Sequence, residues 1–416
     1  MPTSKSRRSP RGQADRDLLT VVKVGGSLLQ SAVDLHRVAS ALAERQREGG
    51  ALLVVASALK GVTDLLDLAA SQARDRQSNG PLGETLDALR HRHVEITRDL
   101  DADGSVLDRV RGALAEVEEL VDSIGATGEL SDAAYARLLS YGERLSVLLL
   151  AAALRKAGLE AQPIAAEEVG LKAAGPPRAG SCDIPASAPG FRRMRSGLES
   201  RILVLTGFYG VGGDGGVVLF GRGGSDDTAC AVAAGLHADR LEMWKDVPGF
   251  MSADPQEVRG ARVIREVSFD EVAQLGAYGS RIVHHGCLDP LRGRSTQVFI
   301  SSIPGNGATG TRLVERLDHR GTRVVALASQ RRSPALIGIV GEGVAGDPEV
   351  RSRMLSCLAA AGVRSDLVAQ PSGRSGLSCT VHPDDLAPAL GGLHESFFAS
   401  SEETAATSKS PARRFQ

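Results

Sequence analysis

The N-terminal part of the chain alternates between mostly apolar runs and segments whose apolar residues recur at helical spacing. Leu18–Val24 is an apolar run that ends at a Gly-Gly pair, and residues 51–59 form a second run. Between them, residues 31–49 place apolar side chains three or four positions apart and end in glycine, which predicts a helix. A strand, a helix and a second strand in this order predict parallel strands in a sheet covered on both faces.

The middle of the chain is predicted to be largely helical and then to return to strands. Residues 64–125 are typical of amphipathic helix with one break, and residues 131–158 of one long buried helix or a helix pair. Strands are predicted at 161–170 and 201–210, and a loop or short hairpin at 171–190.

The last part of the chain changes to a β-α-β-β-α order. Two helical patterns and two apolar segments, the second containing two strands, alternate from residue 334 to residue 398. This order predicts one small ferredoxin-like unit, and the sequence contains no second copy of comparable length. We therefore expect an α/β protein with a disordered tail at 1–17, a first domain at 18–314, the small unit at 315–399 and a second disordered tail at 400–416.

Composition and charge narrow the classes of function. Hydrophobic residues make up 42% and charged residues 24% of the chain, as in packed proteins, but aromatic residues only 3%. A net charge of −1 and few aromatic rings argue against binding to nucleic acids or to a membrane surface. Five cysteines without a C-x-x-C pair, no apolar stretch of about 18 residues and no secretory signal predict a cytoplasmic location and no membrane span.

The segment Lys23–Ser27 (Lys-Val-Gly-Gly-Ser) places a lysine and two glycines between a strand and a helix. Glycine turns and helix starts present backbone N–H groups to anions, and a lysine adds a charge suited to phosphate oxygens. The segment matches neither the P-loop nor the G-x-G-x-x-G pattern. It predicts either a phosphate site of another kind or only a tight turn with a surface lysine.

A second glycine-rich segment, Gly221–Asp226 (Gly-Arg-Gly-Gly-Ser-Asp), follows an apolar strand and leads into a helix. We expect Ser225 or Asp226 to cap this helix. The loop brings a guanidinium and a carboxylate together beside free N–H groups, and a zwitterionic substrate requires both charges. The alternative is a capped turn with solvated charges.

Two adjacent charged residues, Glu143 and Arg144, lie in a helix that is otherwise apolar. Charged residues in such a run are usually paired or functional. The sequence leaves both a structural salt bridge and a role at a site open.

Together these segments resemble the amino-acid kinase superfamily and, within it, the aspartokinases. Lys23–Ser27 is similar to the family's Lys-Phe-Gly-Gly-Thr, Ser140–Ser146 to its Ser-x-Gly-Glu-Arg-Leu-Ser helix, and Gly221–Asp226 to its Gly-Arg-Gly-Gly-Ser-Asp motif. The likeness covers residues 19–395, and its terminal unit resembles an ACT domain, the small-ligand sensor of this family. Further matching segments, in family order, are VVASALKGVTDLL, LTGFYG, ADRLEMWKDVPGFMSADP, GAYGSRIVHHGCLDPL and GNGATGTRL.

The resemblance implies a three-layer αβα sandwich with a mostly parallel central sheet, plus the ACT-like βαββα unit. It also implies that MgATP phosphorylates the side-chain carboxylate of L-aspartate, giving 4-phospho-L-aspartate and ADP for amino-acid or specialised biosynthesis. A carboxylate with a pKa of about 3.9 is already ionised at neutral pH, so no general base is required. Catalysis would then rest on positioning and on neutralisation of phosphate charge.

The resemblance assigns roles to single residues as well. Lys23 would bridge the β- and γ-phosphates, Asp226 would orient Lys23 and the substrate, and Arg222 would hold the substrate α-carboxylate. Around the substrate we also expect Glu143 near its ammonium, with Ser57 and Ser225. The other expected ATP contacts are Gly25, Gly26, Ser27, Lys245, Asp246, Phe250, Asp254 and Arg281.

Mg²⁺ is expected with the nucleotide and not at a metal site of the protein. His284 and His285 are adjacent, and adjacent residues rarely bind one ion without further ligands nearby.

Several positions depart from the family pattern. Val24 and Ser27 are mild replacements, but Arg281 stands where many relatives have lysine and His285 where proline is usual. Gln256 replaces a common arginine, for which Arg259 and Arg262 are the candidate substitutes.

The C-terminus departs most, because the family usually carries two ACT units in tandem. Here the sequence predicts one unit and a remnant strand at 322–328. We expect a homo-oligomer, with a dimer favoured, and weak or absent feedback by lysine or threonine; the alternative is that single units pair across a dimer. Two other functions stay open: a kinase for another amino-acid carboxylate, and a catalytically decayed amino-acid sensor.

Overall fold

The computed structural model describes residues 18–75, 81–304, 310–317, 321–369 and 375–398. The chain divides into two compact units: Met1–Pro248 with Gly286–Thr309, and Gly249–His285 with Gly310–Gln416. Residues 249–285, which the sequence assigns to the first domain, thus group with the C-terminal unit, and the functional boundary at residue 314 stays a prediction. The predicted tails lie outside the described residues.

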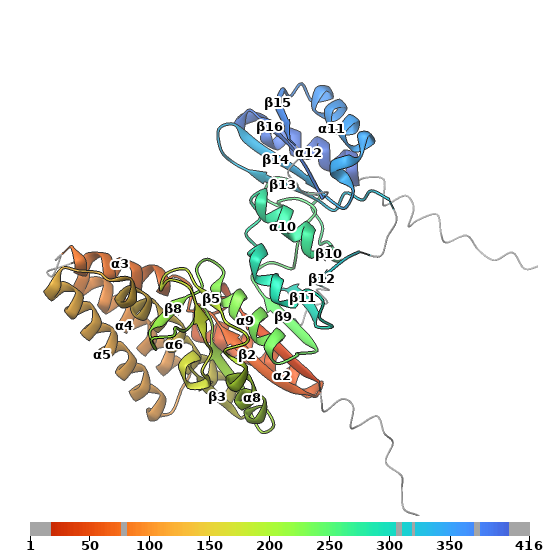
Figure 1. Ribbon diagram of the computed structural model, residues 1–416. Coiled ribbons are helices and arrows are strands. Elements are labelled where there is room, and N and C mark those ends of the chain that lie inside the picture. The colour runs from red at the N-terminus through yellow and green to blue at the C-terminus, as the bar shows by residue number, and fades with distance from the viewer. Residues whose placement is uncertain (1–17, 76–80, 305–309, 318–320, 370–374, 399–416) are drawn as a thin grey trace, which may run out of the picture. The chain divides into compact units, whose positions relative to one another are not determined.

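The first unit is built on a parallel sheet with the strand order β11-β9-β1-β2-β6-β3 (Figure 1). Every residue of β1 is buried, and so is nearly every residue of β2 and β6. Strands buried in this way require cover on both faces of the sheet. The strands are β1 Leu19–Val24, β2 Ala51–Ala56, β3 Ala161–Ile164, β6 Ile202–Thr206, β9 Arg240–Trp244 and β11 Gln297–Ser301.

Helices supply this cover, as the three-layer prediction requires. Helix α6 (Asp132–Lys156) packs on β2, β3, β6 and on α2 (Ala32–Arg47). Helix α9 (Gly224–Gly235) packs on β1, β2 and β9, with α8 (Ala188–Gly197) beside it. The helices α3 Val62–Arg74, α4 Pro81–Asp99 and α5 Gly104–Thr127 form a bundle with α6 (Figure 1).

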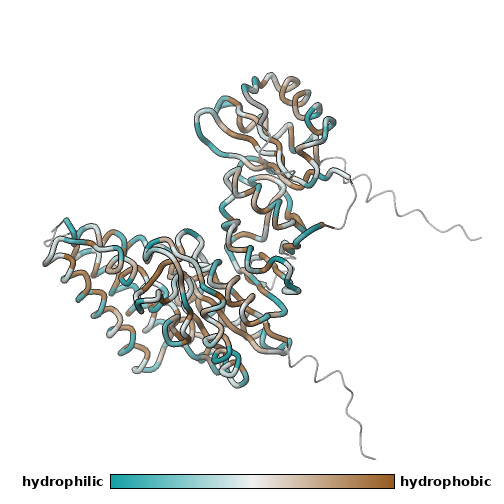
Figure 2. Tube along the Cα trace, in the orientation of Figure 1, coloured by the Kyte–Doolittle hydropathy of each residue, from teal (hydrophilic) through white to brown (hydrophobic). Residues whose placement is uncertain are grey.

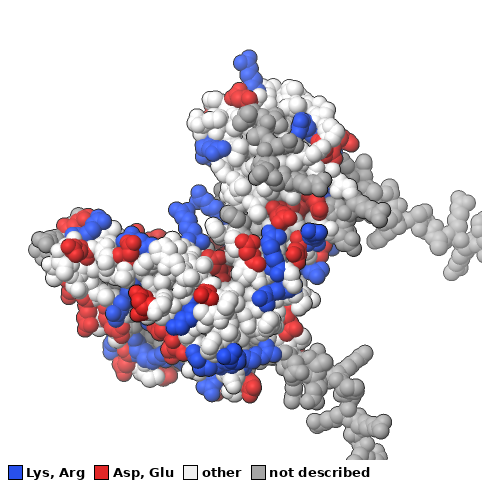
Figure 3. All heavy atoms as spheres, in the orientation of Figure 1, with Lys and Arg blue, Asp and Glu red and all other residues white. Residues whose placement is uncertain are grey.

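The hydropathy along the chain explains this arrangement. In Figure 2 the strands are mostly hydrophobic, whereas the helices of the bundle alternate between hydrophobic and hydrophilic turns. Figure 3 shows acidic and basic side chains mixed on the visible face of each unit, in keeping with a net charge of −1. Among the described residues, no helix combines the length and apolarity needed to cross a bilayer.

Three sequence-based expectations in this unit are corrected. The run 201–210 is not one strand: β6 ends at Thr206, and Phe208, with φ of 75°, turns the chain into β7 (Tyr209–Val211), which pairs with β8 (Val217–Leu219). The run 161–170 ends its strand at Ile164 and continues as the short helix α7, Ala166–Val169. Helix α9 is capped by Gly223 in the left-handed region, not by Ser225 or Asp226, whose side chains serve other contacts.

The predicted short hairpin is present. β4 (Ala173–Ala174) pairs antiparallel with β5 (Ser181–Cys182).

The second unit contains a four-stranded antiparallel sheet with the order β13-β14-β16-β15. The predicted β-α-β-β-α order is confirmed, but the remnant strand overlaps β13 and pairs with β14, so it belongs to this sheet. β10 (Glu266–Ser268) pairs parallel with β12 (Thr311–Val314), and α10 (Phe269–Ala277) follows β10. The remaining elements are β13 Ala326–Gln330, β14 Ala335–Val340, α11 Pro348–Ala360, β15 Ser365–Ala369, β16 Gly376–Val381 and α12 Leu386–Phe398, with short 3-10 turns at Gly26–Leu28, His285–Leu291, Val344–Gly346 and Pro383–Asp385.

Candidate active site

The candidate site lies at the carboxyl edge of the parallel sheet in the first unit. β1, β2, β6 and β9 are neighbours and run in the same direction, so their ends meet at one edge. Ligands of open parallel α/β sheets bind at this edge. Backbone hydrogen bonds join the loops there, from Gly25 N–H to Trp244 O (3.0 Å), Ser57 N–H to Val24 O (3.2 Å) and Gly207 N–H to Ala56 O (3.0 Å).

Two lysines contact the two oxygens of the Asp226 carboxylate. Lys23 Nζ lies 2.8 Å from Oδ1, and Lys245 Nζ lies 2.9 Å from Oδ2. Burial alone would raise the pKa of Asp226, but the charges of the two lysines hold it below its ordinary value. Burial lowers the pKa of the Lys23 ammonium, and Asp226 opposes that shift. Two ammonium groups on one carboxylate leave a local positive charge, which suits a phosphate group.

The first glycine turn lies beside the Lys23 ammonium. A Cβ on Gly26 would lie 2.5 Å from Ala58 O, so only glycine fits there. A Cβ on Gly25 would lie 3.2 Å from Trp244 O and 3.7 Å from Lys23 Nζ. The bare backbone of this turn therefore approaches both the ammonium and the loop after β2, and Ser27 follows it half-buried.

Glu143 and Arg144 separate the two alternatives that the sequence leaves open. Arg144 forms the structural salt bridge, with Glu167, and its guanidinium lies 5.2 Å from the centre of the Tyr209 ring. Glu143 points the other way: its Oε1 accepts the N–H of Ala58 at 3.0 Å, beside Ser57. The Oε2 atom of Glu143 is buried without a hydrogen-bond partner among the described residues, and burial raises the pKa of this carboxyl to about 8.

The second glycine turn presents one buried and one exposed group. Ser225 is buried at the start of α9, next to Asp226, whereas Arg222 is exposed and forms no hydrogen bond or ion pair within the described parts of the chain. Burial and the neighbouring Asp226 raise the pKa of Asp227 to about 7. Sequence reasoning assigned no role to Gly207, whose absent Cβ would lie 2.7 Å from Ser225 Cβ. The Gly-Phe pair in LTGFYG is the signal that marks it.

The other predicted nucleotide residues fall on both units. Asp246 is exposed and directly follows Lys245 in the first unit. In the second unit, Phe250 is buried and donates its N–H to Thr311 Oγ1 at 2.8 Å, Asp254 Oδ1 accepts the N–H of Gln256 at 2.9 Å, and Arg281 is exposed. Their contacts with a nucleotide stay predictions.

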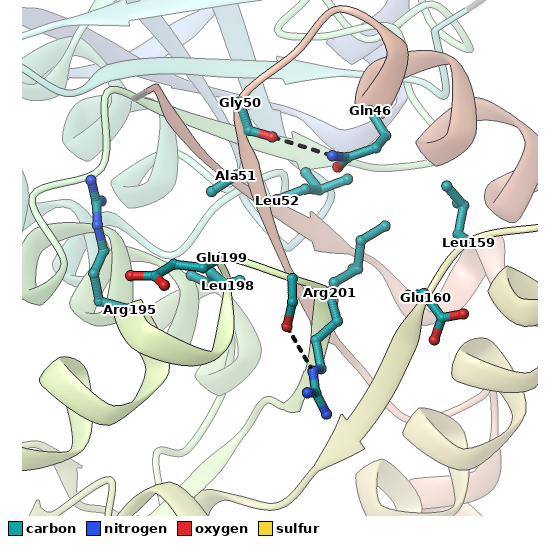
Figure 4. A pocket seen from close by; sticks show the side chains of 12 residues that line it. Gln46, Gly50, Ala51, Leu52, Leu159, Glu160, Arg195, Leu198, Glu199 and Arg201 are labelled. Carbon is teal, nitrogen blue, oxygen red and sulfur yellow. Dashed lines mark hydrogen bonds between the residues drawn. The ribbon is translucent and has the colours of Figure 1, made fainter. Parts of the chain in front are cut away.

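A large groove lies at the opposite, amino edge of the same sheet and is a separate feature (Figure 4). Its volume is about 610 Å³, and its lining includes Ala51 and Leu52 at the start of β2 and Ile202 at the start of β6. Gln46, which also lines it, donates its Nε2–H to Gly50 O at 3.2 Å. None of the predicted site residues lines this groove, so its size does not make it the candidate site.

Comparison with known proteins supports the geometry. The amino acid kinase family matches residues 19–302, and an ACT domain family matches residues 337–397. The chain belongs to the amino acid kinase family. The aspartokinase of Mycolicibacterium smegmatis is 30% identical over 360 residues, which are 85% of this chain and 70% of that protein. The family kinase with a C-terminal ACT domain is therefore confirmed, and its relatives here are aspartokinases.

Two further relatives define how far the likeness extends. Aspartokinase 1 of Arabidopsis thaliana chloroplasts is 27% identical over 377 residues, and the match spans 89% of this chain but only 65% of that protein. This chain thus spans less than two thirds of the length of the plant relative. The solved structure of Escherichia coli aspartokinase III in complex with aspartate and ADP has the same fold, with a TM-score of 0.79 and 22% identity over 91% of this chain and all of that one.

Proposed function

We propose that this chain transfers the γ-phosphoryl group of ATP to the side-chain carboxylate of L-aspartate. The observation that carries this proposal is the buried Lys23–Asp226–Lys245 cluster, which lies at the carboxyl edge of the sheet with a glycine turn on either side of it in the sequence. The kinship with aspartokinases selects aspartate as the acceptor, and the alternative acceptor is another amino-acid carboxylate.

The cluster fits the charge that phosphoryl transfer develops. Asp226 holds the two ammonium groups apart on its two oxygens, so that Lys23 and Lys245 can face the phosphate oxygens together. The N–H groups of Gly25, Gly26 and Ser27 add hydrogen bonds to the same anion. These groups are in place before the substrate binds, which is the source of electrostatic catalysis in such transfers.

The acceptor amino acid would be held by groups of opposite charge. The exposed Arg222 guanidinium suits the α-carboxylate, because it has no competing partner among the described residues. Glu143 has one buried oxygen without a hydrogen-bond partner, and a substrate ammonium would satisfy it. With both ends fixed, the ionised side-chain carboxylate attacks phosphorus in line, and the ADP oxygen leaves.

The residues present suit Mg²⁺ only as an ion that arrives with the nucleotide. Both oxygens of Asp226 already contact lysines, and within the described ranges no group of three His, Cys, Asp or Glu residues gathers to hold a metal. Bound to the phosphates, Mg²⁺ would neutralise part of their charge. A homodimer, weak feedback and a cytoplasmic location remain predictions.

The direct test is aspartate-dependent ADP release by the purified full chain, with glutamate and an aspartate analogue as alternative acceptors. Lys23→Ala should reduce turnover by at least about 1,000-fold while the circular dichroism spectrum is retained. Lys156→Ala is the matched control, since this lysine forms only an exposed ion pair with Asp101. Release with glutamate alone would make the chain a related kinase, and no release with any acceptor would support the decayed sensor.

A further inference from the structure

Ser252 lies between Phe250 and Asp254 and is anchored on both sides of its backbone. Its N–H donates to Arg262 O at 2.8 Å, and its C=O accepts the N–H of Leu327 in β13 at 2.8 Å. Phe250 O accepts the N–H of Ile264 at 2.8 Å, so the chain from 250 to 264 is a closed loop. The conformation of the predicted nucleotide residues in this loop therefore depends on Ser252.

The side chain of Ser252 makes a buried hydrogen bond to the last helix. Its Oγ lies 2.9 Å from Nε2 of His394 in α12, and only 2% of Ser252 and 8% of His394 are exposed. The same Oγ accepts the N–H of Arg262 at 3.0 Å. The Ser252 hydroxyl is therefore best paired when it donates its own proton to Nε2 of a neutral His394 ring. Burial and the charge of Arg262 lower the pKa of His394, which favours that neutral ring.

Helix α12 holds the loop at a second point, one turn further on. The Arg262 guanidinium donates from Nη2 to Phe398 O at 3.1 Å, and the rings of His394 and Phe398 lie 4.7 Å apart. This contact occupies Arg262, one of the two candidate substitutes for the arginine replaced by Gln256. Ala253 and Val258 are buried in the same apolar core as residues of β14, β16 and α12. The loop and the ACT-like sheet are thus one packed body within the second unit.

We propose that His394 is a positioning residue for nucleotide binding, which acts through Ser252 to hold Phe250 and Asp254 in their ATP-binding conformation. This inference rests on the proposed function, because it requires the loop to contact ATP. It gives the terminal helix of the ACT-like unit a direct part in the affinity for ATP.

His394→Phe keeps a planar ring beside Phe398 and removes the hydrogen-bond acceptor, whereas His394→Gln keeps an acceptor near the position of Nε2. We expect His394→Phe and Ser252→Ala each to raise the KM for ATP about fivefold, the effect of one buried hydrogen bond, with the KM for aspartate unchanged. His394→Gln should restore most of the affinity. The double variant should be no worse than either single variant, because both remove the same bond.

The matched control is His382→Ala, an exposed histidine of the same unit that contacts only its own turn. ADP binding by calorimetry gives a readout without turnover. If the wild type releases no ADP with any acceptor yet binds ADP, the proposed function fails while calorimetry on the variants still decides the role of His394. Equal ADP affinity in wild type and His394→Phe, equal losses for both substrates, or no ADP binding by the wild type would each overturn the inference.

Discussion

Glu143 accepts the backbone N–H of Ala58 at 3.0 Å and thereby ties helix α6 to the loop that follows β2. The close approach is possible because the preceding residue is Gly142, whose Cβ would lie 2.8 Å from Ala58 Cβ. The hydrogen bond satisfies only one oxygen of the carboxyl group, and the other is buried without a partner among the described residues. Glu143 therefore carries a cost in the empty site that a substrate ammonium would relieve.

Glu143→Gln is expected to change how stability depends on pH. The folded-state pKa of about 8 lies above the ordinary value of 4.5, so between these values the folded state binds more protons than the unfolded state. The wild-type free energy of unfolding then receives from Glu143 a contribution that falls by up to about 1.4 kcal/mol per pH unit as pH rises through this window. Glutamine does not ionise, so the variant should gain on the wild type from pH 5 to pH 8 in urea denaturation. Parallel curves for the two proteins would contradict the assignment.

Arg222→Ala should raise the KM for aspartate about 10- to 100-fold, the effect of a charged hydrogen bond, and leave the KM for ATP nearly unchanged. Arg222→Lys should recover only part of the affinity, because lysine cannot form the bidentate contact. Steady-state kinetics with each substrate varied in turn measure both constants. Arg195→Ala, an exposed arginine at the amino edge of the sheet, is the control. An unchanged KM for aspartate in Arg222→Ala would remove this residue from the substrate site.

The sequence predicted the parts of the site that follow directly from strand ends. Lys23 and Lys245 end or follow apolar strands, and parallel strands deliver such residues to one edge, so their meeting at Asp226 follows from topology. The family motif also predicted Glu143 correctly as the member of its charged pair that turns toward the loop after β2.

Other features depend on packing between segments that local patterns do not encode. The cap of α9 is Gly223 because the chain enters the helix in a left-handed conformation, whereas side-chain propensity alone favours Ser225 or Asp226. β13 joins the ACT-like sheet by antiparallel pairing with β14, a contact that its own short apolar run does not specify. The bond between Ser252 and His394 joins residues far apart in the chain, and neither belongs to a recognisable motif.

Gly26→Ala and Gly25→Ala test whether the first turn needs bare backbone. The added Cβ at Gly26 would lie 2.5 Å from a backbone oxygen that cannot move aside cheaply, whereas the one at Gly25 meets its nearest atom at 3.2 Å. We expect Gly26→Ala to lower the free energy of unfolding by about 1–3 kcal/mol and to reduce turnover by at least about 100-fold, with a smaller loss for Gly25→Ala. Gly83→Ala in α4, where a Cβ meets nothing within 4 Å, is the control and should be neutral or stabilising. Equal effects at positions 25 and 26 would argue against the steric explanation.

His93 in the helical bundle is expected to govern part of the acid sensitivity of the fold. Its Nδ1–H donates to Leu89 O at 2.8 Å, so the unprotonated Nε2 is the atom that is buried without a partner among the described residues. Burial lowers the pKa of His93 from 6.5 to about 4, so between these values the unfolded state binds more protons and stability falls as pH drops. His93→Leu removes this contribution, and its free energy of unfolding relative to wild type should rise by up to about 1.4 kcal/mol per pH unit as pH falls from 6.5 to 4. His91→Leu, on the same helix with a side chain that is 75% exposed, is the control and should follow the wild-type curve. A His93→Leu curve that runs parallel to wild type in urea denaturation from pH 7 to pH 4 would show that His93 protonates freely in the folded bundle.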